Sequence, residues 1–327
     1  MTQNSCFQSS LSSGWRLHEL IPIFTFLITQ STIGKMSNIL DGKALAKSIK
    51  DEMAATVANL MVNGEKTPHL AAVLVGEDPA SQVYVRNKVK SCEQVGFKST
   101  LIRRAADISQ EELLEIVQQL NKDTDIDGFI VQLPLPKHID EEKITLAIDP
   151  KKDVDGFHPS NFGRMAQGLA AYLPATPNGI LEMLKRYEVP TEGKEVVVLG
   201  RSNIVGMPIG ILLAQKNYPG NASVTICHSR TKDLKKHTLR ADIIVAAIGI
   251  PAFLTADMVK EGVVVIDVGI NRVEDATAKR GYRLCGDVDF EGVAAKAGLI
   301  TPVPGGVGPM TVVSLLMNTL KASKGLV

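Results

Sequence analysis

The segment SQVYVRNKVKSC sets an aromatic ring beside an amine. Tyr84 and Lys88 are four residues apart, so in a helix they stack on one face. The apolar side of that helix, about 100° away, repeats at i, i+4 and i+7 through Val85, Val89 and Cys92. Tyr84 and Lys88 should therefore lie at the margin of the buried surface, where a half-sheltered amine could transfer protons. The structural alternative is a lysine whose stem merely covers a rim tyrosine.

Two further polar side chains could take part in such chemistry. Gln132, in GFIVQLPLP, stands at the C-terminal end of a predicted strand, where open parallel sheets bind ligands. Its amide could bond a substrate, a neighbouring lysine or only the loop backbone. Asp155, in DPKKDVDGFHPSN, could accept parallel hydrogen bonds from a pterin, or it could serve an Asx turn. The spacing is not that of a calcium loop, and we predict no metal site.

The stretch VVVLGRSNIVGMPIG predicts a strand, a glycine turn and a helix N-terminus. This geometry holds a dinucleotide pyrophosphate on free backbone N–H groups and the positive end of a helix dipole. The strand should end at Gly200 and the helix should begin near Val205 and Gly206. The spacing departs from GxGxxG because Ser202 replaces the second glycine, so an ordinary tight turn is the alternative.

The loop after the next strand indicates which nucleotide is bound. Folds that bind NAD place an acid there for the ribose 2′-OH, but here the first acid is Asp233, six residues past Cys227. The residues between them are His228, Ser229, Arg230, Thr231 and Lys232. Hydroxyls and cations suit a 2′-phosphate, which a carboxylate would repel. We predict NADP, with a solvated basic loop as the alternative.

The elements that must position these residues alternate between strand and helix. The predicted strands are 69–76, 98–104, 194–200, 222–228, 241–249 and 262–269, with a further strand in 126–136 that runs into a proline-stiffened loop. The predicted helices are 36–61, 81–92, 109–122, 205–217 and 308–325. Such alternation is typical of parallel βαβ units. We predict an α/β fold of two domains with a cleft between them: an N-terminal βα catalytic domain, 36–172, and a C-terminal Rossmann-like dinucleotide-binding domain, 173–307. The helix 308–325 should fold back on the first domain.

Composition narrows the class of protein. With 327 residues and a net charge of +1, the chain is long enough for two domains and has no electrostatic reason to bind nucleic acid or an anionic membrane. Its four cysteines form no CxxC pair, which favours the reducing cytoplasm over a disulfide framework. Residues 1–35 are predicted to be an unstructured extension or an early start, with Met36 as the working start. A targeting segment is the alternative.

The motifs, taken in order, resemble one family closely, the bifunctional methylenetetrahydrofolate dehydrogenase/methenyltetrahydrofolate cyclohydrolases. The resemblance covers about residues 39–323 and rests on YVRNK, VQLPLP, DVDG, PATPNG, GRSNIVGMP, CHSRT, DVGINR, GDVDF and TPVPGGVGPMT. The last of these, by itself, would read as a stiff connecting loop. The extension lies outside the family pattern, and the insertion EDATAKRGYR after Asn271 should lengthen a surface turn.

The resemblance implies roles for particular residues. It implies that Lys88 is the essential lysine, that Tyr84 stacks on a substrate ring, that Gln132 partners the lysine and that Asp155 binds the pterin. The implied folate-binding set also includes Val131 and Leu133, beside Gln132. It is completed by Pro304, Gly305 and Gly306, which lie in a loop that runs to Gly308. The implied NADP-binding residues are Gly200, Arg201, Ser202, Val205, Gly206, Ser229, Arg230 and Ile270.

The resemblance also implies the reaction. Hydride passes from 5,10-methylenetetrahydrofolate to NADP+, and water then converts the methenyl product to 10-formyltetrahydrofolate, a one-carbon donor used in purine biosynthesis. An ordinary lysine is mostly protonated at neutral pH, so partial burial and a cationic substrate are expected to favour the neutral amine of Lys88. A homodimer through the second domain is implied. The alternatives are a shikimate-type NADP-dependent dehydrogenase, a dehydrogenase without the hydrolase activity, and a non-catalytic nucleotide-binding protein.

Overall fold

The computed structural model describes residues 38–278 and 281–327, so the predictions for residues 1–35 and for Met36 lie outside the described part. The first half of this part contains α1 (Gly42–Val62), β1 (His69–Val75), α2 (Pro79–Val95), β2 (Lys98–Arg104), α3 (Gln110–Lys122), β3 (Gly128–Val131), α4 (Glu141–Ala147) and α5 (Pro159–Ala166). Its sheet has the order β2-β1-β3, with all strands parallel as predicted.

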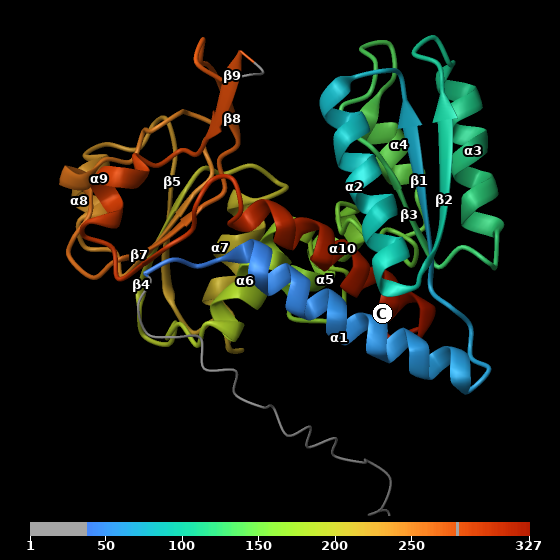
Figure 1. The fold of residues 1–327 in the computed structure, drawn as a ribbon, viewed down its shortest axis with the longest axis horizontal. Coiled ribbons are helices and arrows are strands. Elements are labelled where there is room, and N and C mark those ends of the chain that lie inside the picture. Colours follow the sequence, from blue (N-terminus) through green and yellow to red (C-terminus); the bar gives the residue numbers. More distant parts are fainter. Residues whose placement is uncertain (1–37, 279–280) are drawn as a thin grey trace, which may run out of the picture. The chain divides into compact units, whose positions relative to one another are not determined.

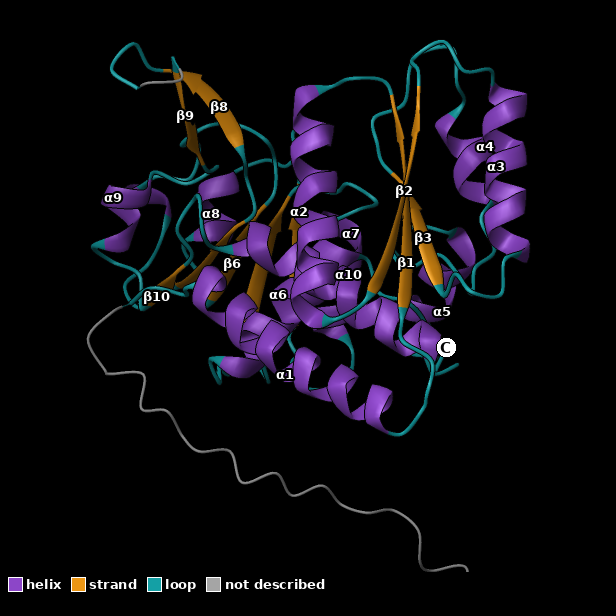
Figure 2. Cartoon of the chain, turned by 45° about the vertical axis from the view of Figure 1, so that its right-hand side comes forward, coloured by secondary structure: helices purple, strands orange, loops and turns teal. Residues whose placement is uncertain are grey.

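Strand β1 forms the centre of this half because it is apolar on both faces. Leu70, Ala72 and Leu74 pack in the cluster that includes α1 and α2, and alternate residues such as Val73 pack against α3 and α4. Figures 1 and 2 show α2 on one side of the sheet and α3 on the other. Helix α3 begins with a capping box, in which the side chains of Ser109 and Glu112 each accept from the other's backbone N–H.

The second half contains α6 (Ala175–Arg186), β4 (Glu195–Leu199), α7 (Gly206–Ala214), β5 (Ser223–Cys227), α8 (Leu234–Thr238), β6 (Ile243–Ala246), η1 (Ala256–Met258), β7 (Val264–Asp267), β8 (Asn271–Glu274), β9 (Tyr282–Cys285), α9 (Phe290–Ala294), β10 (Leu299–Ile300) and α10 (Val307–Ser323). Its parallel sheet has the order β10-β7-β6-β4-β5. The chain leaves β4 for β5 on one side and later returns to β6 on the other. A crevice outside the C-terminal ends of β4 and β6 is therefore the expected ligand position.

Helix α10 folds back as predicted. It packs against α1, α2, β1 and β3 of the first half as well as against α6 of the second. Figure 1 shows α10 running beside α1 and α6. Buried residues such as Met310, Leu315 and Leu316 belong to the same hydrophobic cluster as β1 and β4. One helix therefore completes the apolar core of both halves.

The strand in 126–136 runs into a proline-stiffened loop as predicted: it ends at Val131, because the prolines that follow lack the N–H that a ladder needs. Other elements differ from prediction. The helix predicted over 36–61 begins at Gly42, and short helices such as α4 and α8 were not predicted. Helix α6 was not predicted, since its first turn reads PNG; Pro177 is tolerated there, and a Cβ on Gly179 would come within 3.0 Å of Met310. The insertion after Asn271 is more than a surface turn, because strands β8 and β9 pair there as an antiparallel hairpin.

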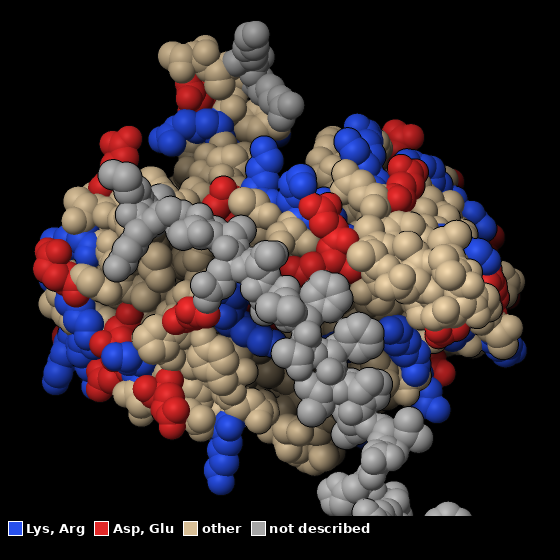
Figure 3. Space-filling model, turned by 60° about the horizontal axis from the view of Figure 1, so that its bottom comes forward, with Lys and Arg blue, Asp and Glu red and all other residues tan. Residues whose placement is uncertain are grey.

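The described residues also show the membrane, surface and cysteine properties of the chain. Within the described residues, no helix combines the length and the apolarity that crossing a bilayer requires. The face seen in Figure 3 carries Lys and Arg side chains interspersed with Asp and Glu. The three cysteines in the described part, Cys92, Cys227 and Cys285, are free.

Candidate active site

Helix α2 holds Tyr84 and Lys88 one turn apart. Asp78 caps its N-terminus by accepting from the N–H of Ser81, and Gly96 ends it in the left-handed conformation. The predicted apolar stripe is confirmed, since Val85 and Cys92 are buried and Val89 packs against the core. Tyr84 is 43% exposed and Lys88 is half-buried, which places both at the predicted margin.

Lys88 meets Gln132, as the resemblance implied. The Lys88 Nζ donates to Gln132 Oε1 at 3.1 Å. The other end of that amide is fixed, because Gln132 Nε2 donates to the Leu133 carbonyl oxygen at 2.7 Å. The Gln132 backbone N–H donates to Val73 of β1 at 2.9 Å. A side chain anchored to the sheet therefore holds the amine in one place.

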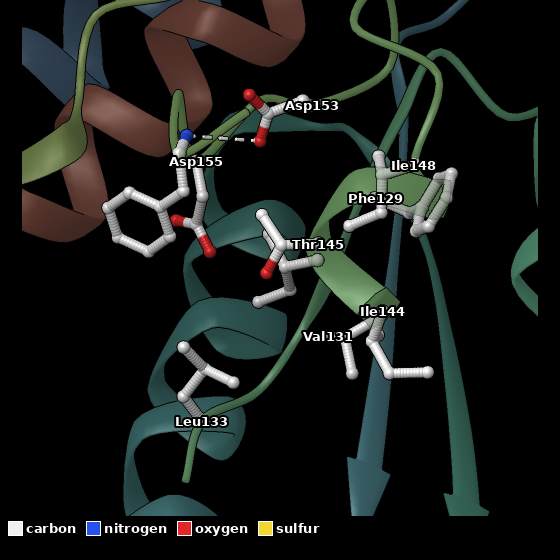
Figure 4. A pocket seen from close by; sticks show the side chains of 10 residues that line it. Phe129, Val131, Leu133, Ile144, Thr145, Ile148, Asp153 and Asp155 are labelled. Carbon is white, nitrogen blue, oxygen red and sulfur yellow. Dashed lines mark hydrogen bonds between the residues drawn. The ribbon is translucent and has the colours of Figure 1, made fainter. Parts of the chain in front are cut away.

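Asp155 and Asp153 have different surroundings in one loop. Asp153 is buried and accepts from the backbone N–H groups of Phe157 (3.2 Å) and His158 (2.8 Å) and from the amide of Asn161 (2.9 Å). Burial raises the pKa of the Asp153 carboxyl to about 6. Within the described residues no group donates to the Asp155 carboxylate, which Figure 4 shows turned into a pocket. Asp153 thus shapes the turn, and Asp155 is left for a ligand.

This first pocket lies beside β3 and α4. It is mainly apolar and is lined by Phe129, Ile130, Val131, Leu133, Ile144, Thr145, Ile148, Asp153, Asp155 and Phe157. Val131 and Leu133 are predicted folate-binding residues, and Gln132 stands between them in sequence. Two of the residues that line the pocket therefore flank, along the chain, the residue whose amide holds Lys88.

A second cavity, of about 230 Å³, is lined from both halves of the described chain. Helix α2 contributes Tyr84 and Asn87, and the other walls are Asp267–Ile270, Leu284, Pro302–Pro309 and Val312. Three large hydrophobic side chains of this lining are exposed: Tyr84, Ile270 (47%) and Leu284 (39%). Exposed apolar groups around one hollow are typical of a site for a flat, mostly apolar ligand.

The proline- and glycine-rich loop reaches this cavity because of its packing against α1. The Lys43 N–H donates to the Gly305 carbonyl oxygen at 2.8 Å, and a Cβ on Gly42 would come within 1.8 Å of the Gly306 carbonyl oxygen. Gly305 itself has φ +112°, a conformation that other residues rarely adopt. The loop is thus more than a connector, since its shape presents Pro304 to the cavity.

The structure joins some predicted residues and leaves others apart. Lys88 and Gln132 are in contact but line neither hollow, and the glycine turn at Gly200 and the basic loop after Cys227 line neither as well. Ile270 is the predicted NADP-binding residue that faces the same cavity as Tyr84. Along the chain, Lys88 is one turn from Tyr84 and its partner Gln132 adjoins the Asp155 pocket. The contacting pair is thus adjacent, along the chain, to lining residues of both hollows.

The predicted strand, glycine turn and helix N-terminus are present, although the N–H groups of Val205, Gly206 and Met207 are bonded to Ser202. Helix α7 begins at Gly206, and the Ser202 hydroxyl accepts from the N–H groups of Val205 (3.2 Å) and Gly206 (3.4 Å). Gly200 has φ +112°, and a Cβ there would come within 2.1 Å of the Ala247 carbonyl oxygen. The loops after β4 and β6 thus touch at the point where the strand order reverses, which is where a pyrophosphate fits.

The basic loop after β5 is ordered by its own side chains. The His228 N–H donates to Thr231 Oγ1 at 2.9 Å, and the Arg230 N–H donates to His228 Nδ1 at 3.1 Å. Ser229 and Arg230 are left exposed, as is Arg201 in the glycine turn. These hydroxyl and guanidinium groups are available to a 2′-phosphate.

A buried pair of aspartates, which the sequence did not reveal, supports the nucleotide-binding loops. Asp287 accepts from the N–H groups of Ile248 (2.7 Å) and Gly249 (2.9 Å), and Asp267 accepts from those of Gly269 (3.0 Å) and Asp287 (2.9 Å). Burial raises the pKa of the Asp267 carboxyl to about 6. The only sequence signal was their presence in DVGINR and GDVDF.

Comparison with known proteins identifies the family. A model described as the catalytic domain of tetrahydrofolate dehydrogenase/cyclohydrolase matches residues 40–155, and one described as the NAD(P)-binding domain matches residues 174–326. The chain belongs to the tetrahydrofolate dehydrogenase/cyclohydrolase family. The resemblance found in the motifs is thereby confirmed, and with it the two-domain α/β fold. The shikimate-type and non-catalytic alternatives are set aside.

Individual relatives of this family agree. The bifunctional protein FolD of Phocaeicola vulgatus is 62% identical over 286 residues, which cover 88% of this chain and 98% of that protein. The crystal structure of the bifunctional FolD enzyme from Campylobacter jejuni superposes with a TM-score of 0.82 at 48% identity, covering 88% of this chain and 99% of that one. A Trypanosoma brucei FolD structure, described as complexed with NADP cofactor and inhibitor, gives 0.83 at 39% identity, with 89% and 98% covered.

Proposed function

We propose that this chain oxidises 5,10-methylenetetrahydrofolate with NADP+ and then hydrolyses the 5,10-methenyl product to 10-formyltetrahydrofolate. The observation that carries the proposal is the Lys88–Gln132 contact, 3.1 Å long, which joins a residue one helical turn from Tyr84 of the second cavity to the residue between Val131 and Leu133 of the Asp155 pocket. A folate is an elongated molecule with a polar heterocycle at one end, a reactive carbon next to it and a benzoyl ring beyond. Its three parts correspond to the three features in order.

In this arrangement each end of the substrate has a suitable partner. The Asp155 carboxylate accepts from the pterin N–H and amino groups, and Val131 and Leu133 form apolar walls beside it. Tyr84 stacks on the benzoyl ring, while Pro304, Gly305 and Gly306 cover that ring from the opposite loop. With both ends of the folate bound in this way, its one-carbon unit lies beside Lys88.

The amine performs the proton transfers of the hydrolysis. Water attacks the methenyl carbon, and a neutral Lys88 amine takes a proton from that water. The ring nitrogen receives this proton as its bond to the one-carbon unit breaks, and the remaining hydroxyl proton is released to solvent as the formyl C=O forms. Gln132 Oε1 accepts from Nζ whether the amine is charged or neutral, so the side chain stays in place through the cycle.

NADP fits the second half of the chain. The cradle formed by Gly200, Ser202, Val205 and Gly206 would hold its pyrophosphate, and Arg201, Ser229 and Arg230 would hold its 2′-phosphate. Ile270 would contact the nicotinamide end, because it lines the cavity that also contains Tyr84. When bound, NADP+ accepts the hydride, and the protein's part is to align the two reactants.

The remaining parts of the proposal concern the domain boundaries, the oligomeric state, the pathway and the cellular location. The folate domain is 36–172 completed by 308–325, and the NADP domain is 173–307. The family resemblance supports a homodimer through the NADP domain and a place in the one-carbon supply of purine biosynthesis. A cytoplasmic location is supported by the free cysteines, with targeting by residues 1–35 as the alternative. Light scattering and fractionation of the full chain would test the dimer and the location.

An absorbance assay tests the central activity. Methylenetetrahydrofolate and NADP+ should give reduced cofactor without lasting accumulation of the methenyl compound. Reduced cofactor with accumulating methenyl compound would reveal a dehydrogenase that lacks the hydrolase activity. Absence of reduction with either NADP+ or NAD+ would refute the proposal.

A further inference from the structure

Asn318 on α10 is a fully buried side chain, with 0% of its surface exposed. Its Nδ2 donates one hydrogen to the carbonyl oxygen of Val154 at 2.8 Å and the other to that of Leu173 at 2.9 Å. Val154 immediately precedes Asp155, and Leu173 begins the turn into α6. One amide therefore ties the Asp155 loop to the connection between the two halves and to the last helix.

The far end of the same amide is unsatisfied. Within the described residues, Asn318 Oδ1 is buried without a hydrogen-bond partner. A buried acceptor without a partner is costly, so the position keeps an amide for the two carbonyl groups that its Nδ2 binds and tolerates the unsatisfied oxygen. A local departure from good packing is typical of a position that holds a functional element.

The next residue of the loop is constrained as well. Gly156 has φ +72°, and a Cβ there would come within 2.6 Å of the Leu173 backbone. Asp155 thus stands between two fixed points, the Val154 carbonyl held by Asn318 and Gly156 seated against Leu173. Within the described residues its own carboxylate receives no hydrogen bond, so the backbone on either side sets its direction.

We propose that Asn318 is a positioning residue for Asp155, which holds the carboxylate in the direction that binds the heterocycle of the folate. The inference rests on the proposed function, because it takes Asp155 as the folate-binding carboxylate. Asn318 touches no reacting atom. Its effect should therefore appear in folate affinity and be absent from NADP+ affinity.

A double-mutant cycle tests this role. Tetrahydrofolate is the probe, because it lacks the one-carbon bridge and does not react; its Kd and that of NADP+ are measured by calorimetry well below each variant's Tm. We expect D155A to weaken tetrahydrofolate binding about 10- to 100-fold. N318L should weaken it at least about fivefold, with NADP+ binding unchanged, and the double variant should match D155A within about twofold.

Ser314→Ala is the matched control. Ser314 lies one turn earlier on α10, is equally buried, and accepts from the Asn178 amide at 2.7 Å. This variant loses a buried hydrogen bond of the same helix without touching the Asp155 loop, so its folate Kd should equal that of the original chain. Asn318→Ser keeps one donor and serves if N318L does not fold; its loss should be smaller than that of D155A.

The outcomes separate this inference from the proposed function. If N318L, or N318S in its place, binds tetrahydrofolate as S314A does, the positioning role is wrong while the function stands. The role is equally wrong if the losses in N318L and D155A multiply in the double variant. If D155A binds normally, the role fails with the Asp155 assignment, and an original chain without turnover refutes the function itself.

Discussion

Lys88 and Lys90 lie two residues apart on one helix and have different surroundings. Lys90 points into solvent, whereas Lys88 is half-buried and bonded to Gln132. The sequence was enough to predict this difference in exposure. Helical spacing puts the two lysines on different faces of the helix, and Gln132 was predicted to stand at the C-terminal end of a strand. The sequence could not divide the site into two hollows, since their walls come from segments that only the fold brings together. Asp287 and Asn318 were missed for the same reason.

Lys88→Met should abolish hydrolysis more completely than oxidation. Loss of the base should slow hydrolysis of preformed methenyltetrahydrofolate roughly 100- to 10,000-fold. Hydride transfer depends on alignment and needs no proton from the amine, so it should fall less. Both rates can be followed by absorbance, with Lys90→Met as the control that changes neither. Full hydrolytic activity in the Lys88 variant would refute the role.

Arg230→Ala should narrow the preference for NADP+ over NAD+. Removing one guanidinium from a 2′-phosphate should raise the KM for NADP+ roughly tenfold and leave the KM for NAD+ unchanged. Steady-state kinetics with each nucleotide would measure this. Lys236→Ala, an exposed cation on α8, is the control. Equal increases for both nucleotides would show that Arg230 does not read the phosphate.

At the scale of elements, continuous apolar runs predicted the strands well because parallel strands are buried on both faces. β2 was placed to the residue, and β4 and β5 to within one residue at each end. Helix α6 was missed because its first turn carries proline and glycine, which in isolation read as loop. Its glycine is required by the close approach of α10, a contact that local sequence does not encode.

Gly200→Ala should impair both stability and cofactor binding. Its φ of +112° and the 2.1 Å approach to the Ala247 carbonyl oxygen forbid a Cβ without movement of one loop. We expect a loss of about 1–3 kcal/mol in the free energy of unfolding and a raised KM for NADP+. Gly193→Ala is a matched control, since Gly193 also has positive φ (+71°) but nothing within 4 Å of its Cβ position. Equal effects on NADP+ binding would contradict the loop contact.

At the scale of the molecule, two of the buried carboxyls, Asp153 and Asp267, make the free energy of unfolding depend on pH. Burial raises the pKa of both Asp153 and Asp267 from 3.8 to about 6, so between these values the folded chain binds more protons than the unfolded chain. Their contribution to the free energy of unfolding is fully present below about pH 4 and is lost as pH rises through 6. Carboxyls with a lowered pKa, such as Asp242 beside Lys260, make the free energy of unfolding rise with pH instead, and they do so only at lower pH.

Thermal unfolding measured between pH 4.5 and 7.5 should show the pH dependence that Asp153 and Asp267 cause. Tm should fall across the window, and each carboxyl should contribute on the order of 1 kcal/mol. Asp267→Asn, which cannot ionise, should flatten the slope, although it weakens one accepted hydrogen bond. Asp257→Asn is the control, because the Lys235 ammonium lowers the pKa of this exposed carboxyl to about 2 and keeps it charged throughout. A Tm that rises with pH would contradict the assignment.

The return of α10 has a consequence for biosynthesis. The amide of Asn318 closes a loop of 164 residues when it reaches Val154. A ribosome therefore exposes the whole three-stranded sheet, with one apolar face incompletely covered, while the nucleotide-binding half is still being translated. The nascent folate domain should bind chaperones that recognise apolar surface, and release should coincide with emergence of the final helix.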